Sequence, residues 1–121
     1  MEEWEFEFEW LRTRHAIKKT MEMDALPDIQ GILLVIGIHT LGKVQEDWTK
    51  EEKQDLMHIA TCTLLEQEGY FEFEAFDAEG WPHFKAIEKP NSNGVAEQER
   101  LLQRLAIGYL KEHLPQEAFA Q

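Results

Sequence analysis

The chain contains 121 residues with a mass of 14.2 kDa, which matches the size of one ordinary domain. Hydrophobic residues make up 43% of it, so the chain can build a core and is not globally disordered. Asp and Glu number 24 against 12 Lys and Arg, a formal charge of −12, which argues against nucleic acid and anionic membrane surfaces as partners. The charge favours basic or metal-ion partners without selecting one, and the sequence specifies no activity.

The cysteine content and the first residues of the chain point to the cytoplasm. Cys62 is the only cysteine, so no intrachain disulfide can form. The first ten residues are acidic and lack the basic and apolar regions of a signal peptide. The longest apolar stretch, Ile29–Leu41, is shorter than the roughly 18 residues that a membrane-spanning helix needs. We therefore expect a soluble cytoplasmic protein that binds neither nucleic acid nor membranes.

Residues 1–23 fit two periodicities. The segment from Glu5 to Trp10 alternates between charged and aromatic side chains, as a strand does. The helical period runs through the whole segment, so we predict a helix, residues 4–10 included. One apolar face of this helix would carry Phe6, Trp10, Ile17 and Met21, and the opposite face Trp4, Phe8, Leu11 and His15. Both faces then need a cover, which this chain or a second copy must supply.

Two further helices follow. The segment from Asp28 to Gly42 is apolar nearly all round, which predicts a central helix that starts at Asp28 and stops at Gly42. Thr49 and Glu52 have the spacing of a capping box. The third helix should therefore begin at Thr49 and run to about Glu68.

Residues 70–87 show the alternation of an antiparallel hairpin that folds at residues 77–80. One register matches opposite charges and apolar side chains at once. Its pairs are Phe76–Trp81, Glu74–His83, Phe73–Phe84, Glu72–Lys85 and Phe71–Ala86. An isolated hairpin is marginal in water, so the face formed by Phe71, Phe73 and Phe84 should lie on the helices.

A last helix should run from about Val95 to Leu114 and stop at Pro115, which leaves residues 116–121 as a loose tail. None of the breaks between the elements is long enough for a domain linker. The predicted fold is one α+β domain over residues 1–121. It is mostly helical, with about four α-helices and one antiparallel β-hairpin packed against them.

Two stretches of the chain resemble a small family of uncharacterised bacterial proteins. They read LPDIQGILLVIGIHTLGK, from Leu26 to Lys43, and WTKEEKQDLMHIATCTLLEQEGYFEFEAFDAEGWPHFK, from Trp48 to Lys85. The resemblance implies a bacterial cytoplasmic protein. It implies no activity, so no residue takes a functional role from it.

Nitrogen and sulfur side chains offer one candidate site. His58 and Cys62 are four residues apart and share a helix face, while His39 and His15 lie on the central and first helices. If the helices bundle, these four side chains could converge on a transition metal, or Cys62 and a histidine could act as nucleophile and base. We favour the alternative, in which Cys62 is a small core residue, His39 is a hydrogen-bonded buried imidazole and no cofactor binds.

Glu74 and His83 form a second candidate, because the predicted register sets them opposite each other between Phe76 and Trp81. A carboxylate that orients an imidazole beside an aromatic wall can serve as an acid–base pair. A cross-strand pair without a catalytic role is the simpler interpretation.

The third candidate is the one basic cluster of the chain. Its members are Arg12, Arg14, His15, Lys18 and Lys19, and together they could bind a phosphate or a carboxylate. The helical wheel separates Arg14 and Lys18 from Arg12 and Lys19. We therefore expect a solvated helix whose charges pair with one another.

Four tryptophans are many for so small a chain, because a domain of this size cannot bury four indoles fully and tryptophan is enriched at interfaces. We take Trp4, Phe8, Trp10 and Trp81 as candidate interface residues. The favoured hypothesis is an interaction or regulatory protein that self-associates, most simply as a homodimer, rather than an enzyme. The alternatives are a small ligand- or metal-binding protein that could be an enzyme, and an acidic nucleic-acid mimic that occupies a basic protein partner.

Overall fold

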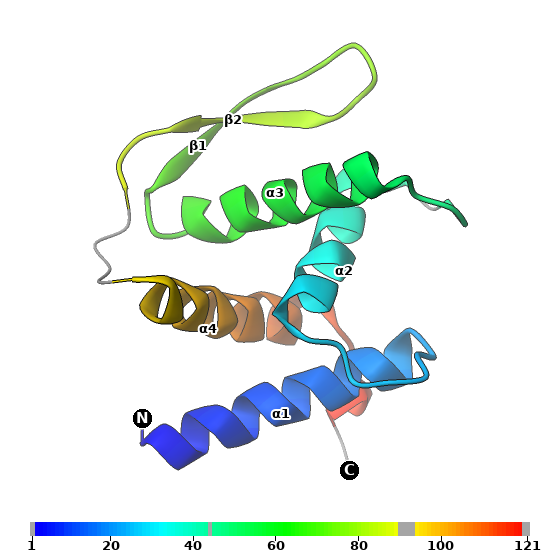
Figure 1. The fold of residues 1–121 in the computed structure, drawn as a ribbon, viewed down its shortest axis with the longest axis vertical. Helices are drawn as coiled ribbons and strands as arrows, with labels where there is room; N and C mark the ends of the chain where they lie inside the picture. Colours follow the sequence, from blue (N-terminus) through cyan, green and yellow to red (C-terminus); the bar gives the residue numbers. More distant parts are fainter. Residues whose placement is uncertain (1, 44, 90–93, 120–121) are drawn as a thin grey trace.

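The computed structural model describes residues 2–43, 45–89 and 94–119 (Figure 1). Its elements are α1 (Glu3–Thr20), α2 (Ile29–Leu41), α3 (Lys50–Glu66), β1 (Phe71–Phe76), β2 (Pro82–Ala86), α4 (Val95–His113) and the 3-10 helix η1 (Gln116–Phe119). The predicted mostly helical α+β fold with one antiparallel hairpin is confirmed. In Figure 1 the hairpin, α3, α4 and α1 follow one another from top to bottom, and α2 packs against α3 and α4.

α1 is a helix, as we predicted from the helical period that runs through the whole segment. A capping box between Glu2 and Glu5 closes its first turn. One of its two predicted apolar faces is packed, because Phe6 and Ile17 are buried and α4 lies along the helix. Met21, which we expected on the same face, follows the last turn and is exposed. The opposite face lies in solvent.

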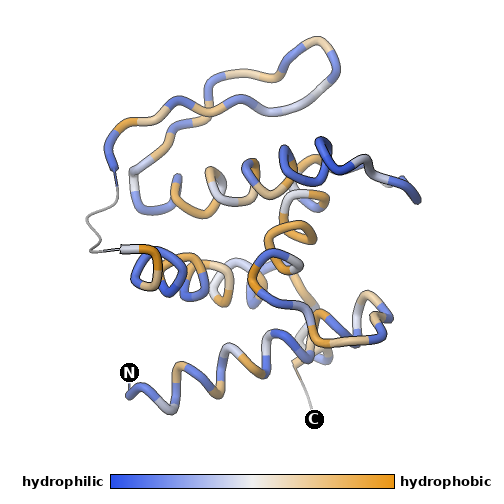
Figure 2. Tube along the Cα trace, viewed as in Figure 1, coloured by the Kyte–Doolittle hydropathy of each residue, from blue (hydrophilic) through white to orange (hydrophobic). Residues whose placement is uncertain are grey.

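α2 is the central helix that the sequence predicts. The Asp28 side chain accepts a hydrogen bond from the Gly31 N–H at 2.9 Å and caps the first turn. Gly42 ends the helix in the left-handed conformation, with φ of +76°. The helix is apolar along most of its length (Figure 2).

The contact between α2 and α3 forms the middle of the core. Ile32 and Ile36 on α2 are 0% exposed, and they share the core with Leu64 of α3. Gly37 allows the two helices to approach closely, because a Cβ at this position would overlap the backbone carbonyl of Leu56. The α2–α3 contact therefore depends on a glycine as well as on apolar burial.

α3 begins with the predicted capping box. The Glu52 N–H donates to Thr49 Oγ1 at 3.0 Å, and the Thr49 N–H donates to Glu52 Oε1 at 2.9 Å. The helix ends at Glu66, slightly earlier than the expected end at Glu68. Gly69, with φ of +81°, then turns the chain toward the hairpin.

β1 and β2 pair antiparallel, and the predicted register is confirmed in the half of the hairpin away from its turn. Phe71 pairs there with Ala86, Glu72 with Lys85 and Phe73 with Phe84. A β-bulge then leaves Glu74 without a partner, so that Ala75 lies opposite His83 and Phe76 opposite Pro82. The predicted pairs Glu74–His83 and Phe76–Trp81 are therefore wrong.

The turn explains this shift. The Asp77 N–H donates to the Trp81 carbonyl at 2.9 Å, and Asp77 Oδ1 accepts from the N–H groups of Glu79 and Trp81. Asp77 rather than Phe76 thus closes the turn against Trp81. The first strand then has one residue more than its partner, and this extra residue, Glu74, forms the bulge.

The hairpin packs on α3 over part of one face only. Phe71 contacts the core and Phe84 is half-buried, as we expected. Phe73 is 40% exposed, so the expectation that it lies on the helices is wrong. A two-stranded ribbon twists strongly, and the single helix beneath it cannot cover its whole length.

The end of the chain differs from the loose tail that we expected for residues 116–121. Residues 116–119 form η1, which packs against α1, and Phe119 is buried. Arg12 Nε donates to the Phe119 carbonyl at 3.1 Å and fixes η1 in place. Residues 120–121 lie outside the described part of the chain. Within the described ranges, no helix is long and apolar enough to cross a membrane.

Candidate functional site

The predicted histidine and cysteine ligands do not meet. His15 lies on the second half of α1, and His39 lies on the last turn of α2, where it contacts α4. Only His58 and Cys62 are neighbours, with 3.6 Å between Nε2 and Sγ on α3. Over residues 2–43, 45–89 and 94–119, no group of three or more His, Cys, Asp or Glu side chains is placed to hold a metal ion. The structure therefore gives no support to a shared metal site.

Cys62 has the properties of a core residue rather than of a nucleophile. Its side chain is 0% exposed, and burial raises the pKa of the thiol to about 11. At neutral pH the sulfur is therefore protonated, although His58 lies beside it. A reactive cysteine has the opposite properties, since it needs a lowered pKa and access to solvent.

His39 belongs to a cluster that we did not predict. Its Nδ1 lies 2.7 Å from the Tyr109 hydroxyl, and the ring centroids of His39 and His113 are 5.1 Å apart. Tyr109 is buried, but His39 itself is exposed, unlike the buried imidazole that we expected. The cluster joins the last turns of α2 and α4. Tyr109 and His113 are four residues apart on α4, so helical spacing puts them on one side of the helix, but it cannot show which helix this side meets.

The candidate acid–base pair has a different carboxylate from the expected one. His83 Nε2 lies 3.0 Å from Asp77 Oδ2, whereas Glu74 sits in the bulge. The contact with His83 holds the pKa of the Asp77 carboxyl below its ordinary value, and hydrogen bonds from the Trp81 and Glu79 N–H groups add to the effect. Both side chains of the pair are well exposed. The Asp77–His83 pair therefore joins the turn to β2.

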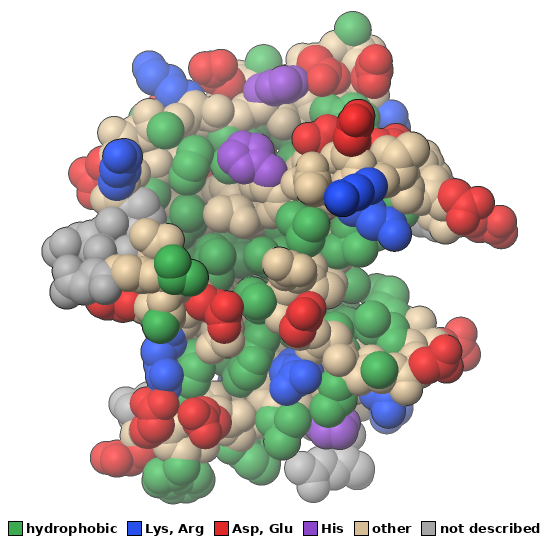
Figure 3. All heavy atoms as spheres, viewed as in Figure 1, with side chains coloured by type: hydrophobic (Ala, Val, Ile, Leu, Met, Phe, Trp, Pro, Cys, Tyr) green, Lys and Arg blue, Asp and Glu red, His purple; other side chains and the backbone are tan. Residues whose placement is uncertain are grey.

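A cleft of about 360 Å³ separates the first half of α3 from the hairpin, and we call it the α3–hairpin cleft. It is lined by Glu52, Asp55, His58, Ile59, Asp77, Glu79, Trp81, Pro82, His83 and Phe84. Three predicted site residues, namely His58, Trp81 and His83, thus share one cleft although we assigned them to separate sites. On the face shown in Figure 3, carboxylates and histidines gather over the hairpin and α3.

The outer side of α1 exposes three large apolar side chains to solvent. Trp4 is 70% exposed, Phe8 50% and Leu11 43%. These three residues follow one another at helical spacing, and we call them the outer stripe. Trp10 instead packs against the core from the other side of α1, and Trp81 stacks edge-on against Trp48. Of the four predicted interface residues, Trp4 and Phe8 therefore lie together on an open surface.

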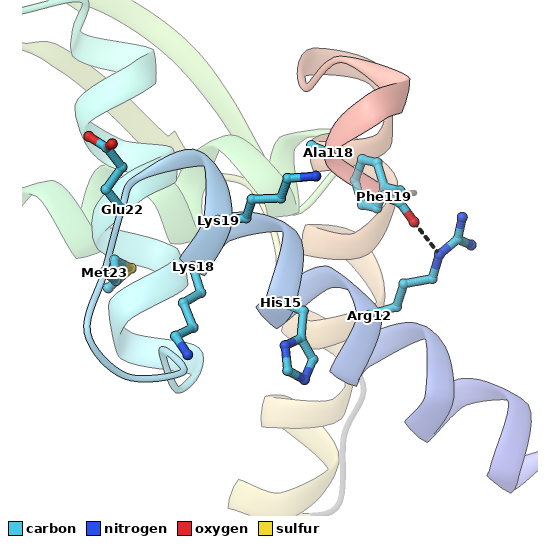
Figure 4. A pocket seen from close by; sticks show the side chains of 8 residues that line it. All are labelled: Arg12, His15, Lys18, Lys19, Glu22, Met23, Ala118 and Phe119. Atoms are coloured by element: carbon cyan, nitrogen blue, oxygen red, sulfur yellow. Dashed lines mark hydrogen bonds between the residues drawn. The ribbon is translucent and has the colours of Figure 1, made fainter. Parts of the chain in front are cut away.

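Beside the outer stripe lies a hollow of about 650 Å³ between α1 and η1, which we call the basic hollow (Figure 4). It is lined by Arg12, His15, Lys18, Lys19, Glu22, Met23, Ala118 and Phe119. Lys18 and Lys19 both border it, but they extend in different directions, Lys19 with Arg12 on the side of η1 and Lys18 away from it, as the predicted separation into two flanks implies. The hollow exists because η1 docks along α1. That docking joins distant parts of the chain, and the helical wheel cannot represent it.

The charges of α1 on its inner side are already paired. Glu3 pairs with Arg100, and Glu9 lies 2.9 Å from the Lys111 ammonium. This ammonium lowers the pKa of the Glu9 carboxyl, and Arg12 adds to the effect. Lys18 and Lys19 form no ion pair with any described residue. The basic hollow therefore contains two ammonium groups without an ion-pair partner among the described residues, although the Glu22 side chain also lines it.

Comparison of the chain with protein-family models, with curated proteins and with solved structures found no match. The resemblance to a small bacterial family therefore stays a prediction. The functional argument rests on the geometry of the chain itself.

Proposed function

We propose that this protein is an interaction module that self-associates through the outer side of α1. The observation that carries the proposal is the outer stripe, in which Trp4, Phe8 and Leu11 are all large, apolar and exposed. An exposed apolar residue alone needs no explanation, but a contiguous group marks an interaction surface. Tryptophan and phenylalanine each bury roughly 150–250 Å² when a partner covers them, so the stripe supplies the kind of anchors that interfaces use.

The surroundings of the stripe extend this surface. Leu11 also borders a groove between α1 and the start of α4. Val95, at the other wall of this groove, is 82% exposed. A specific interface covers roughly 800 Å² on each partner, which one helix face and its neighbours can provide. Apolar anchors surrounded by charged residues are the arrangement expected of an interface core and its rim.

A second copy is a better candidate for the cover than an unrelated basic protein. α1 carries acidic side chains in its first half and basic ones in its second, so its surface offers both charges to a partner. A uniformly basic partner would match only the first half. A copy of the same chain can match both halves, and symmetric dimers are the commonest assemblies of soluble proteins.

A cytoplasmic location is part of the proposal. The single cysteine supports it, because Cys62 is a free thiol in the fold and nothing in the described chain depends on a disulfide. Fractionation of cells that express the protein tests it. The proposal is contradicted if the protein is recovered outside the cytoplasmic fraction.

Sedimentation velocity over a range of about 1 to 500 μM tests the self-association. We expect the apparent mass to rise with concentration from 14.2 kDa to twice that value. The variant Phe8→Ser/Leu11→Ser should remain a monomer, because it removes two of the three apolar anchors. Circular dichroism should show the same helix content, since both side chains are exposed.

A matched control is available on the hairpin side of the molecule. Phe76 is 65% exposed and Ile87 is 51% exposed, so Phe76→Ser/Ile87→Ser removes as much apolar surface away from α1. This variant should self-associate like the unmodified chain. A monomer at every concentration, or equal weakening by both double variants, would rule out the outer stripe as the interface.

A further inference from the structure

The charge along α1 is divided between its two halves. Residues 2–9 include five glutamates and no lysine or arginine, while residues 12–19 include four lysines or arginines, His15 and no acidic residue. The outer stripe of Trp4, Phe8 and Leu11 runs along the first half and into this boundary. Two such helices side by side in the same direction would set glutamate against glutamate. Turned end for end, each acidic half meets a basic half.

We infer that two copies pair through antiparallel α1 helices about a twofold axis, and that Trp4 of each copy occupies the basic hollow of the other. This inference deepens the proposed self-association and rests on it. It specifies the direction of the helices, their register and the residue that acts as the main anchor.

The register follows from the outer stripe together with His15, which continues the same exposed face of α1. The centre of these four positions lies between Phe8 and Leu11, so an antiparallel pairing about this point sets Phe8 of one copy against Leu11 of the other. Trp4 then lies at the level of His15 of the second copy, since these residues are equally far from the centre. His15 borders the basic hollow, so Trp4 arrives at its mouth.

The basic hollow suits an indole ring in shape and in chemistry. Its volume of about 650 Å³ lies within the range of ordinary ligand sites. Met23, Ala118 and Phe119 give it an apolar part that can take the body of the ring. Lys18 and Lys19 keep their charge unpaired in the described fold, and an ammonium group over an indole face is the strongest cation–π contact. In Figure 4, Lys19 and Arg12 extend on the side of η1, whereas Lys18 and His15 point away from it.

Two arginines lie at the level of the acidic half of the second copy. Arg12 Nε donates to the Phe119 carbonyl at 3.1 Å, and Arg14 Nε donates to the Pro27 carbonyl at 2.7 Å. These bonds hold each guanidinium through its Nε. Arg12 also contacts Glu9 of its own helix, with 3.4 Å between Nη1 and Oε1, and its remaining N–H groups can reach a second carboxylate. In the antiparallel register, Glu5 and Glu7 lie at the level of Arg12 and Arg14 of the second copy. The acidic half of one helix thus meets donors that need little further ordering.

Trp4→Ala tests the anchor, with the dimer dissociation constant from sedimentation equilibrium as the readout. A hot-spot residue costs 2 kcal/mol or more when truncated, so we expect the constant to rise by at least about 30-fold. Trp4→Phe should raise it less, because an aromatic ring remains. Phe76→Ala is the matched control, since Phe76 is exposed to a similar degree and lies on the hairpin. We expect that variant to change the constant by less than about twofold.

A spin label tests the direction of the helices independently of the anchor. Thr20 is exposed at the end of α1, and Thr20→Cys allows a nitroxide to be attached there, while buried Cys62 stays unlabelled. In the antiparallel register the two labels of a dimer lie about 30 Å apart along the helix axes, from a rise of 1.5 Å per residue. A parallel pair would bring them within about 20 Å. Pulsed dipolar spectroscopy measures this distance.

The outcomes separate this inference from the proposed function. A protein that stays monomeric overturns both. A dimer that Phe8→Ser/Leu11→Ser abolishes, but whose labels at residue 20 lie within about 20 Å, supports the proposed interface and overturns the antiparallel arrangement. If the labels lie about 30 Å apart but Trp4→Ala leaves the dissociation constant unchanged, the helices are antiparallel and Trp4 is not the anchor. A long distance and a large loss of affinity are the results that we expect.

Discussion

α2 and the outer side of α1 are both rich in apolar residues, yet α2 is buried in the core and the outer side of α1 is exposed. Ile36 on α2 is 0% exposed, whereas Trp4 on α1 is 70% exposed. The difference lies in the neighbours. α2 is packed by α3 and α4, while α1 contacts α4 and η1 and leaves one side open. An apolar pattern therefore predicts that a face needs a cover, and the number of available elements decides whether this chain supplies it.

The two regions should also contribute to different free energies, α2 to that of unfolding and the outer stripe to that of association. The α2–α3 contact buries its side chains within one chain, so changes there should alter the free energy of unfolding. The outer stripe of α1 is open in the single chain, so changes there should alter association and leave the monomer's stability nearly unchanged. Substitutions in the two regions test this division.

The largest effect should come from Gly37→Ala. A Cβ at Gly37 would overlap the backbone carbonyl of Leu56, which cannot move aside as a flexible side chain would. Forcing α2 and α3 apart should lower the free energy of unfolding by about 3 kcal/mol or more. The midpoint of urea unfolding measures the loss.

Gly108→Ala is the matched control for this experiment. Gly108 lies inside α4, and nothing is within 4 Å of the position where its Cβ would be. Alanine has the higher helix propensity, so this variant should gain up to about 1 kcal/mol. A Gly37→Ala variant as stable as the unmodified chain would show that α2 and α3 do not approach as closely as described.

A smaller effect should separate the two apolar regions directly. Ile36→Val removes one methylene from a filled part of the core and should cost about 1 kcal/mol in the free energy of unfolding. Leu11→Val removes the same group from the outer stripe and should cost less than about 0.5 kcal/mol at concentrations where the protein is monomeric. Urea titrations at low concentration compare the two. Equal costs would mean that the outer side of α1 is covered within the single chain.

Local patterns were sufficient to predict most of the elements. The helix starts at Asp28 and Thr49 depend only on residues a few positions away, so both could be predicted locally, and the capping box of Thr49 followed from its spacing to Glu52. The two apolar faces of α1 also follow from a fixed period. The half of the hairpin away from its turn kept its predicted register, because Phe73 and Phe84 match in the one way that separates apolar from charged faces.

Features that depend on distant contacts could not be predicted. The bulge at Glu74 arises because the Asp77 carboxylate takes N–H donors across the turn, which alternation of residue types does not encode. The docking of η1 depends on Arg12, more than a hundred residues away in sequence. The candidate ligand set shows the same limit: helical spacing places His58 beside Cys62, but it does not bring His15 or His39 to them.

The smallest effect concerns the inner edge of α1, where Glu9 links this helix to Lys111 of α4. The pKa of Glu9 is lowered in the folded chain, chiefly by the Lys111 ammonium, from the ordinary value of 4.5. A lowered carboxyl pKa stabilises the fold above the unfolded pKa, and this stability is lost as the pH falls through the folded value. Lys111 is about half exposed, so solvent screens the pair and limits its contribution to about 1 kcal/mol at most.

Glu9→Gln should therefore lower the free energy of unfolding at pH 7 and have a smaller effect near pH 3, where the unmodified carboxyl is increasingly protonated in both states. Urea unfolding at the two pH values gives this difference. Glu7→Gln is the control, because Glu7 forms no ion pair with a described residue and should show no such pH dependence in the monomer. An effect of Glu9→Gln that stays constant between pH 7 and pH 3 would show that packing, and not the charge of Glu9, joins the inner edge of α1 to α4.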